Sequence, residues 1–172
     1  FNAWEYGWES NRAELKENSS KIFYSYLKNG FTPAGFFKEF VNLDRKFEEP
    51  VHSIRRQSEG IYAMLHFLAY EKEQGRRHPE WEQRMKKMLD MFMQLQNEDG
   101  SFPRKFRDDF SIVDKSGGST PSATLPLVMG YKYFKDKRYL TSAKRTADYL
   151  ERELISKSDY FSSTLDANCE DK

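Results

Sequence analysis

Apolar residues recur with the period of an α-helix in five segments of the chain. Spacings of three and four residues between apolar positions predict amphipathic helices. Turn residues such as Asn29, Gly30 and Gly75 mark two of the helix ends, and Asn11 with Glu14 is typical of a capping pair at a helix start. No pair of segments alternates convincingly with the period of strands, so the pattern predicts an all-α fold. The predicted helices are 11–28, 58–74, 79–96, 121–135 and 138–155.

Two kinds of helix alternate along the chain. In 58–74 and 121–135, apolar and aromatic residues surround most of the helix, which indicates burial on nearly all sides. In 79–96 and 138–155, they form one stripe opposite charged residues, which is typical of an outer helix. The alternation, with a soft repeat of about sixty residues, predicts an array of αα-hairpins. The stripe expected in the last helix is Leu140, Ala143, Ala147, Leu150 and Leu154.

The connections between these helices have two lengths. Passages from a buried helix to the next outer helix are short, as at 73–78 and 135–137. Passages from an outer to a buried helix are long, at 29–57, 97–119 and 157–169. Long irregular loops in compact domains are usually functional or disordered, and these contain aromatic, acidic and arginine residues. We therefore expect the functional site at the long-loop end of the array.

Composition and charge exclude several classes of protein. The 28 Lys and Arg residues nearly balance the 27 Asp and Glu residues, so we expect no nucleic-acid partner, because such proteins present a basic surface. No apolar run approaches the length of a membrane span, so we expect none. Cys169 is the only cysteine, and His52, His66 and His78 lack metal-ligand spacing, which predicts neither metal nor cofactor. We interpret His66 as a core residue and His78 as a helix cap.

The stretch QLQNEDGSF, at the end of the third predicted helix, has residues suited to a tight turn. We expect Gln96 to bond backbone groups that are left unpaired at helix ends. Asn97 and Asp99 are suited to bonding nearby backbone groups, and Gly100 to a positive φ. Phe102 should fold back as a plug. We interpret the turn as structural, and a direct catalytic role for Asp99 is the alternative.

The order of these motifs resembles that of the α/α-toroid proteins, especially the six-hairpin glycosidases and their epimerase and lyase relatives. In that group an outer helix often ends in a turn of Gln, Asp, Gly and an aromatic residue, which Gln96, Asp99, Gly100 and Phe102 match. The segments SGGS before TPSATLPLVMGYKYF, and TLDANCEDK, also look like loops that lead into inner helices of such enzymes. The resemblance covers roughly 58–172. It implies a partial (α/α) barrel or toroid of alternating inner and outer helices, with a sugar-binding cleft at the amino ends of the inner helices.

This resemblance implies a carbohydrate-active protein that acts on an oligosaccharide or polysaccharide, with hydrolysis favoured over epimerase or lyase chemistry. Glycoside hydrolysis commonly uses two carboxyl groups, and loop carboxylates are plentiful here. We single out Asp166 and Asp171 as the catalytic candidates, because TLDANCEDK precedes the next expected inner helix. Capping of that helix by Asp166 is the alternative. The alternative function is a non-catalytic helical-repeat scaffold for protein binding.

Arginines and aromatic residues of the long loops are the candidates for substrate binding. Arg55 and Arg56 could clamp a uronate or sulfate group, and an ion pair with Glu48 or Glu49 is the alternative. Aromatic rings could stack on sugar faces, or else anchor their own loops. The candidates are Arg55, Arg56, Phe106, Arg107, Tyr160 and Phe161.

Five helices fall short of a closed ring of six hairpins. We therefore expect 1–172 to be a single domain that is a fragment of a larger toroid domain. The flanks of its inner helices would be exposed, which favours self-association. We expect negligible glycosidase activity from the chain alone, because a cleft built from several hairpins must hold its groups in register.

Overall fold

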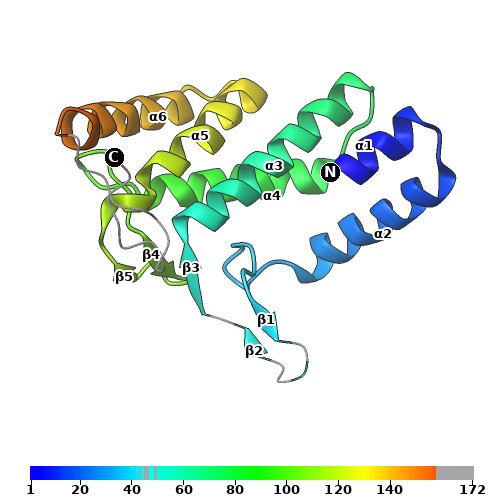
Figure 1. The fold of residues 1–172 in the computed structure, drawn as a ribbon, viewed down its shortest axis with the longest axis horizontal. Coiled ribbons are helices and arrows are strands. Elements are labelled where there is room, and N and C mark those ends of the chain that lie inside the picture. The colour runs from blue at the N-terminus through cyan, green and yellow to red at the C-terminus, as the bar shows by residue number, and fades with distance from the viewer. Residues whose placement is uncertain (43, 45–46, 49, 158–172) are drawn as a thin grey trace.

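The computed structural model describes residues 1–42, 44, 47–48 and 50–157, which form a series of helical hairpins joined by short strands (Figure 1). Successive helices run back and forth, and α3 packs against both α4 and α5. A π-helical turn, Leu150–Ile155, continues the last helix. The helices are α1 (Asn2–Glu9), α2 (Ala13–Asn29), α3 (Ile54–Glu73), α4 (Pro79–Gln94), α5 (Thr120–Phe134) and α6 (Lys137–Tyr149), with a short 3-10 helix at Gly117–Ser119.

All five predicted helices are confirmed, with small shifts at their ends. Helix α1 was not predicted, because it is only eight residues long and its large apolar residues are a few aromatic ones. The predicted capping pair is wrong, because α2 begins at Ala13 without a side-chain cap. Asn11 instead takes a positive φ of 53°, and its side chain accepts a hydrogen bond from Lys16 Nζ at 2.7 Å.

The alternation of inner and outer helices is also confirmed. The inner helices α3 and α5 pack extensively on each other, α4 covers α3, and α6 covers α5. Leu125 on α5 remains exposed, as expected for the flank of an inner helix. The structure contains one chain, so self-association through these flanks stays a prediction.

Side chains on α3 and on α6 lie differently from the predicted pattern. His66 is exposed rather than buried in the core, because it lies on the face of α3 turned away from Leu65 and Leu68, near the ring of Phe1. On α6, Ala147 is exposed and the polar Ser142 and Thr146 are buried instead. The hydrophobic pattern misplaced this face because the buried hydroxyls are hydrogen-bonded to Gln96.

Short antiparallel strands join the long loops, where no strand pair was predicted, and the predicted all-α fold class is confirmed. Strand β3 (Val51–Ser53) pairs with β4 (Lys105–Arg107), which pairs with β5 (Ile112–Asp114). A separate hairpin joins β1 (Val41–Asn42) to β2 (Phe47–Glu48). Strands of two or three residues carry no readable alternation, and β3 and β4 come from loops far apart in sequence.

The α1–α2 hairpin is attached to the array through a buried carboxylate on α3. Glu71 accepts hydrogen bonds from Trp4 Nε1 at 2.8 Å and from Arg76 Nε at 2.8 Å. His78 stands at the amino end of α4 as expected, but its side chain makes no capping bond; its Nε2 lies 2.9 Å from Glu71 Oε2. Burial opposes ionisation of Glu71, yet these hydrogen bonds outweigh it and lower the pKa.

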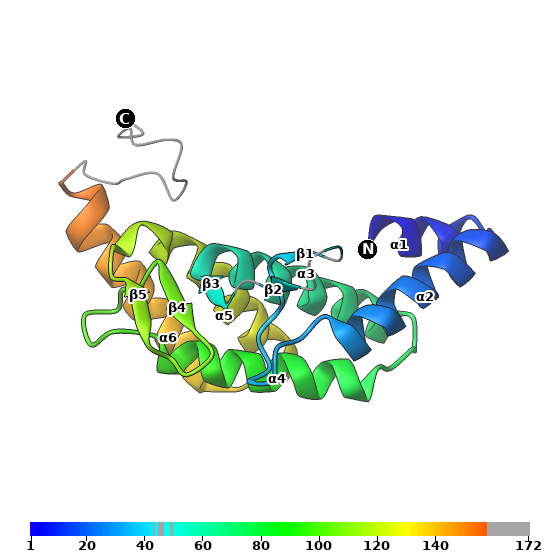
Figure 2. The same cartoon turned by 90° about the horizontal axis from the view of Figure 1, so that it is seen from below.

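The sheet of β3, β4 and β5 lies toward one end of the molecule, which we call the strand end, and the α1–α2 hairpin lies at the other end, with β1 and β2 between them (Figure 2). Strand β3 runs directly into α3, and α5 begins shortly after β5. The amino ends of both inner helices therefore lie at the strand end, as predicted for the long loops (Figure 1). Among the described residues, no helix combines the length and apolar character needed to cross a membrane.

Candidate functional site

The turn QLQNEDGSF joins α4 to the long loop before α5 and is held by hydrogen bonds. Gln96 Nε2 donates to the carbonyls of Gly100 and Ser142, at 3.1 and 3.0 Å. Gly100 has a φ of 98°, and Phe102 is fully buried against Phe92. The side chain of Asp99 accepts from the N–H of Ser101 at 2.9 Å. The structural interpretation of the turn is confirmed, because the Asp99 side chain bonds within the turn itself.

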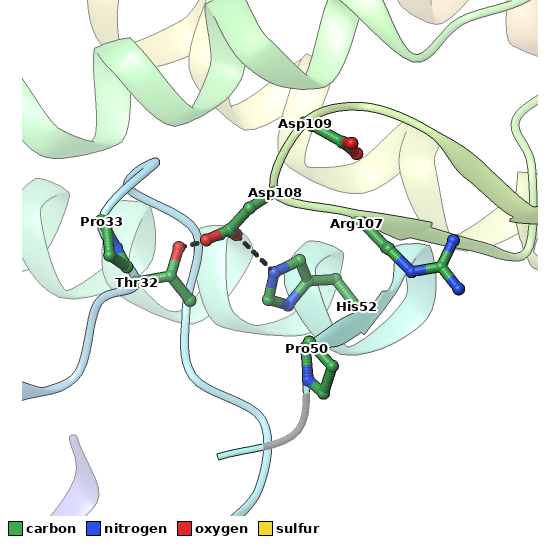
Figure 3. A pocket seen from close by; sticks show the side chains of 7 residues that line it. All are labelled: Thr32, Pro33, Pro50, His52, Arg107, Asp108 and Asp109. Carbon is green, nitrogen blue, oxygen red and sulfur yellow. Dashed lines mark hydrogen bonds and ion pairs between the residues drawn. The ribbon is translucent and has the colours of Figure 1, made fainter.

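A pocket lies further along the same loop, where it meets the loop that precedes β3 (Figure 3). Its volume is about 420 Å³. Three separate segments contribute: the turn after α2, the β3 strand and the β4–β5 turn. The lining residues are Thr32, Pro33, Pro50, His52, Arg107, Asp108 and Asp109.

A histidine and a carboxylate meet in this pocket. His52 Nε2 is 2.7 Å from Asp108 Oδ1, which also accepts from Thr32 Oγ1 at 2.8 Å. The His52 side chain is 1% exposed and that of Asp108 is 39% exposed. Asp108 is therefore the group that a ligand can reach, and His52 lies behind it. Within the described part of the chain, His52 Nδ1 is buried without a hydrogen-bond partner.

Aromatic packing places His52. Residues opposite each other in an antiparallel pair share a face of the sheet, and His52 lies opposite Phe106. The ring of Phe36 packs against both, with ring centres 5.3 Å from His52 and 4.9 Å from Phe106. The imidazole is thereby fixed by hydrophobic contacts that need no polar partner.

An amide clamp holds the segment 30–40 against α3. Gln57 accepts from the Phe37 N–H at 2.9 Å and donates to the Phe37 carbonyl at 2.8 Å. Gly60 makes room for this segment, since a Cβ there would lie 2.7 Å from the Phe37 ring. The clamp brings Thr32 within reach of Asp108.

Glu39 belongs to the same segment and is buried at the amino end of α3. Its side chain is 5% exposed and accepts from the Ser53 N–H at 2.6 Å and from Gln57 Nε2 at 2.9 Å. Burial raises the pKa of Glu39, although these hydrogen bonds and the charge of Arg56 oppose the rise. The strand end thus contains a buried carboxyl group that takes a proton more readily than an exposed one.

The structure places four of the predicted substrate-binding residues. Arg55 pairs with Glu59 at 2.9 Å, and Arg56 lies 3.6 Å from Glu39, so both arginines have described acidic partners other than the expected Glu48 and Glu49. The last two are Phe106 and Arg107.

Phe106 is fully buried, so it anchors the loop rather than presenting a face for stacking. Arg107 borders the pocket, and its guanidinium points away from Asp108 (Figure 3). Tyr160, Phe161, Asp166 and Asp171 lie outside the described residues, and their roles stay predictions.

The pair of His52 and Asp108 was not singled out from the sequence. The two residues are 56 positions apart, and no local pattern links them. Gly60, a lone glycine inside a helical pattern, was the available signal, because such a glycine often marks a close contact. Across the described ranges, no three His, Cys, Asp or Glu side chains are grouped so that they could hold a metal ion.

No family model matches the sequence. The fold is similar to that of a cellobiose 2-epimerase from Spirochaeta thermophila, with a TM-score of 0.70 and 16% identity, over 93% of this chain and 41% of that one. It is also similar to a sugar epimerase from a ruminal bacterium, with a TM-score of 0.67 and 18% identity, over 88% of this chain and 39% of that one. A cellobiose 2-epimerase from Bacillus thermoamylovorans matches with a TM-score of 0.66 and 17% identity, over 82% of this chain and 36% of that one.

These similarities confirm the fold predicted from the sequence. The three solved structures are α/α-toroid proteins of the six-hairpin type, and the present chain has part of that architecture. It spans about two fifths of their lengths.

Proposed function

We propose that this chain is part of a carbohydrate-active α/α-toroid enzyme and that its strand end binds an oligosaccharide or polysaccharide. The observation that carries the proposal is the pocket lined by Pro33 and Pro50, in which the partly exposed Asp108 carboxylate is hydrogen-bonded to His52 and Thr32. The similarity of fold to sugar epimerases supports the class of substrate.

The chemistry of the pocket suits a sugar. A carboxylate accepts hydrogen bonds from sugar hydroxyls, and the rings of Pro33 and Pro50 offer apolar surface to the C–H groups. The contacts from His52 and Thr32 to Asp108 Oδ1 fix the carboxylate before a ligand arrives, which lowers the entropy lost on binding.

For the reaction, we propose glycoside hydrolysis with Asp166 and Asp171 as the carboxyl pair, in line with the sequence motifs. Epimerisation is the second candidate, favoured by the similarity of fold to two cellobiose 2-epimerases and a sugar epimerase. Both reactions move protons at a sugar carbon or oxygen, so both need groups of matched pKa close to the substrate.

Product analysis separates these candidates. The full-length protein would be incubated with neutral and uronic-acid-containing oligosaccharides, and the products analysed by chromatography. New, shorter sugars indicate hydrolysis, whereas sugars of unchanged length and altered configuration indicate epimerisation. Asp166→Asn and Asp171→Asn should each lower hydrolysis about 100-fold or more if they act as acid and base, with unchanged melting temperatures.

A negative result has a defined meaning. If no sugar in the panel is bound or converted, and a specific protein partner is recovered through the strand end, the chain is a helical scaffold instead. In that case Asp108→Asn should weaken the protein complex and leave no sugar-dependent signal.

A further inference from the structure

The polar groups around the pocket are nearly all hydrogen-bond acceptors. The Thr32 hydroxyl donates its hydrogen bond to Asp108 Oδ1, so only the lone pairs of its oxygen remain for a ligand. When a neutral imidazole donates from Nε2 to a carboxylate, its Nδ1 carries a lone pair, and Nδ1 of His52 has no described partner. Asp108 and Asp109 add two carboxylates.

Within the described ranges, neither acid of the pocket forms an ion pair with a lysine or an arginine, although Arg107 also lines the pocket and its charge helps to lower the pKa of Asp109. Asp108 bonds to His52 and Thr32, and Asp109 Oδ1 accepts from the Ser111 N–H at 2.9 Å. The Ser111 hydroxyl and N–H lower the pKa of Asp109, which keeps it ionised at neutral pH. The two carboxylates of the pocket therefore outnumber its one guanidinium group, that of Arg107.

The nearby arginines are directed elsewhere. Arg107 points away from Asp108 (Figure 3), and Arg104 pairs with Asp114 at 3.3 Å. Arg55 and Arg56 lie beside Glu59 and Glu39. Arg55 and Arg56 do not line this pocket, and their clamp for a uronate or sulfate stays a prediction.

We infer that the pocket binds an amino sugar through its ammonium group, in preference to neutral or acidic sugars; this rests on the proposed function. An ammonium group has three N–H donors and a positive charge, and so matches a pocket in which acceptors outnumber donors and carboxylates outnumber guanidinium groups. A carboxylate or sulfate has no donor and would be repelled by Asp108 and Asp109. The buried Nδ1 of His52 marks a place for one further donor, supplied by the ligand as it settles between Pro33 and Pro50.

Calorimetric titration of the full-length protein tests this with sugars matched in length. Glucosamine oligomers should bind about tenfold more tightly than their N-acetylated counterparts, a difference of about 1.4 kcal/mol. Uronic-acid oligomers should bind more weakly than either. Raising the pH until the ligand amine loses its proton should remove the preference.

Two variants and a control locate the effect. Asp108→Asn should abolish the preference for the amine, and Asp109→Asn should reduce it. Asp148→Asn removes an exposed carboxylate from α6, away from the pocket, and should leave binding unchanged. Melting temperatures of all variants show whether a loss of binding reflects unfolding.

The outcomes distinguish the two proposals. If neutral oligosaccharides bind and the amine makes no difference, or if Asp148→Asn has the same effect as Asp108→Asn, the amino-sugar inference is wrong and the proposed function stands. Tighter binding of uronic-acid oligomers has the same meaning. If no oligosaccharide of any class binds, both proposals fail.

Discussion

Two parts of one loop, between α4 and α5, use their polar residues in opposite ways. In the turn from Gln96 to Phe102, side-chain amides and carboxylates are paired with nearby backbone and with α6. Around Asp108, the loop leaves a carboxylate facing solvent and a buried imidazole nitrogen without a described partner. The turn has the features of a structural element, and the pocket has those of a site that is completed by a ligand.

The largest stability effect is expected at Gly100. Its φ is 98°, and an added Cβ would overlap the Arg145 carbonyl oxygen, so Gly100→Val should destabilise the protein by about 3 kcal/mol through strain and overlap. Gly75→Val is the matched control, because Gly75 also has positive φ but has no atom near its Cβ position. Chemical denaturation measures both. Equal losses would show that the contact with α6 contributes nothing.

Gln96→Leu should have the second largest effect. It removes the hydrogen bonds of Gln96 to two carbonyls and to the Thr146 hydroxyl, and leaves the buried Ser142 hydroxyl without its acceptor, at a cost of about 2 kcal/mol. Gln94→Leu, on the exposed side of α4, should change the free energy of unfolding only slightly. A Gln96 variant as stable as the Gln94 variant would contradict the importance of this network.

A smaller stability effect is expected in the pocket. His52→Phe fits between Phe36 and Phe106 and removes a buried nitrogen that has no described partner, so it should cost less than about 1 kcal/mol. The same variant should still weaken sugar binding, because Asp108 loses one of its two hydrogen bonds. Unfolding and sugar titration, measured on one sample, test whether this variant weakens binding without a matching loss in the free energy of unfolding. A loss of stability as large as that of Gln96→Leu would contradict the proposed difference between the pocket and the turn.

The smallest effect is a dependence of stability on pH at Glu39. Its pKa in the folded protein is raised, so the proton is bound more tightly in the folded than in the unfolded state. The folded state is therefore favoured below the unfolded pKa, and this advantage is lost as the pH rises through the folded pKa. Glu39→Gln keeps an acceptor for Ser53 and Gln57, so the variant should gain stability relative to the natural protein above that range. Melting curves at several pH values would show the difference; a constant difference would exclude Glu39 as its source.

The sequence was sufficient for the helices and for the turn. Helices such as α3 and α5 repeat their apolar pattern over many residues, and the residues around Gly100 act within a few positions of one another. Both kinds of signal are local. The buried face of α6 was misplaced because Ser142 and Thr146 are buried through partners on another helix.

The pocket was not predictable in the same way. His52, Thr32 and Asp108 are each unremarkable in their own segments. The pairing of β3 with β4 brings His52 to Asp108, and the clamp from Gln57 brings Thr32 there. Strands of three residues are too short for their sequence pattern to predict that pairing. Asp166 and Asp171 were predicted as site residues because they belong to the segment TLDANCEDK, whose residues are neighbours in the sequence.

The distances along the chain within this pocket also bear on the order in which the protein folds. Thr32 and Asp108 are 76 residues apart, and His52 and Asp108 are 56 apart. Contacts between distant residues close large loops and tend to form after local ones. The helical hairpins can form from neighbouring residues, whereas the pocket requires two of them to have docked already. Quenching of a fluorophore placed beside Asp108 would therefore develop later than helical circular dichroism, and the pocket would report that the array has assembled.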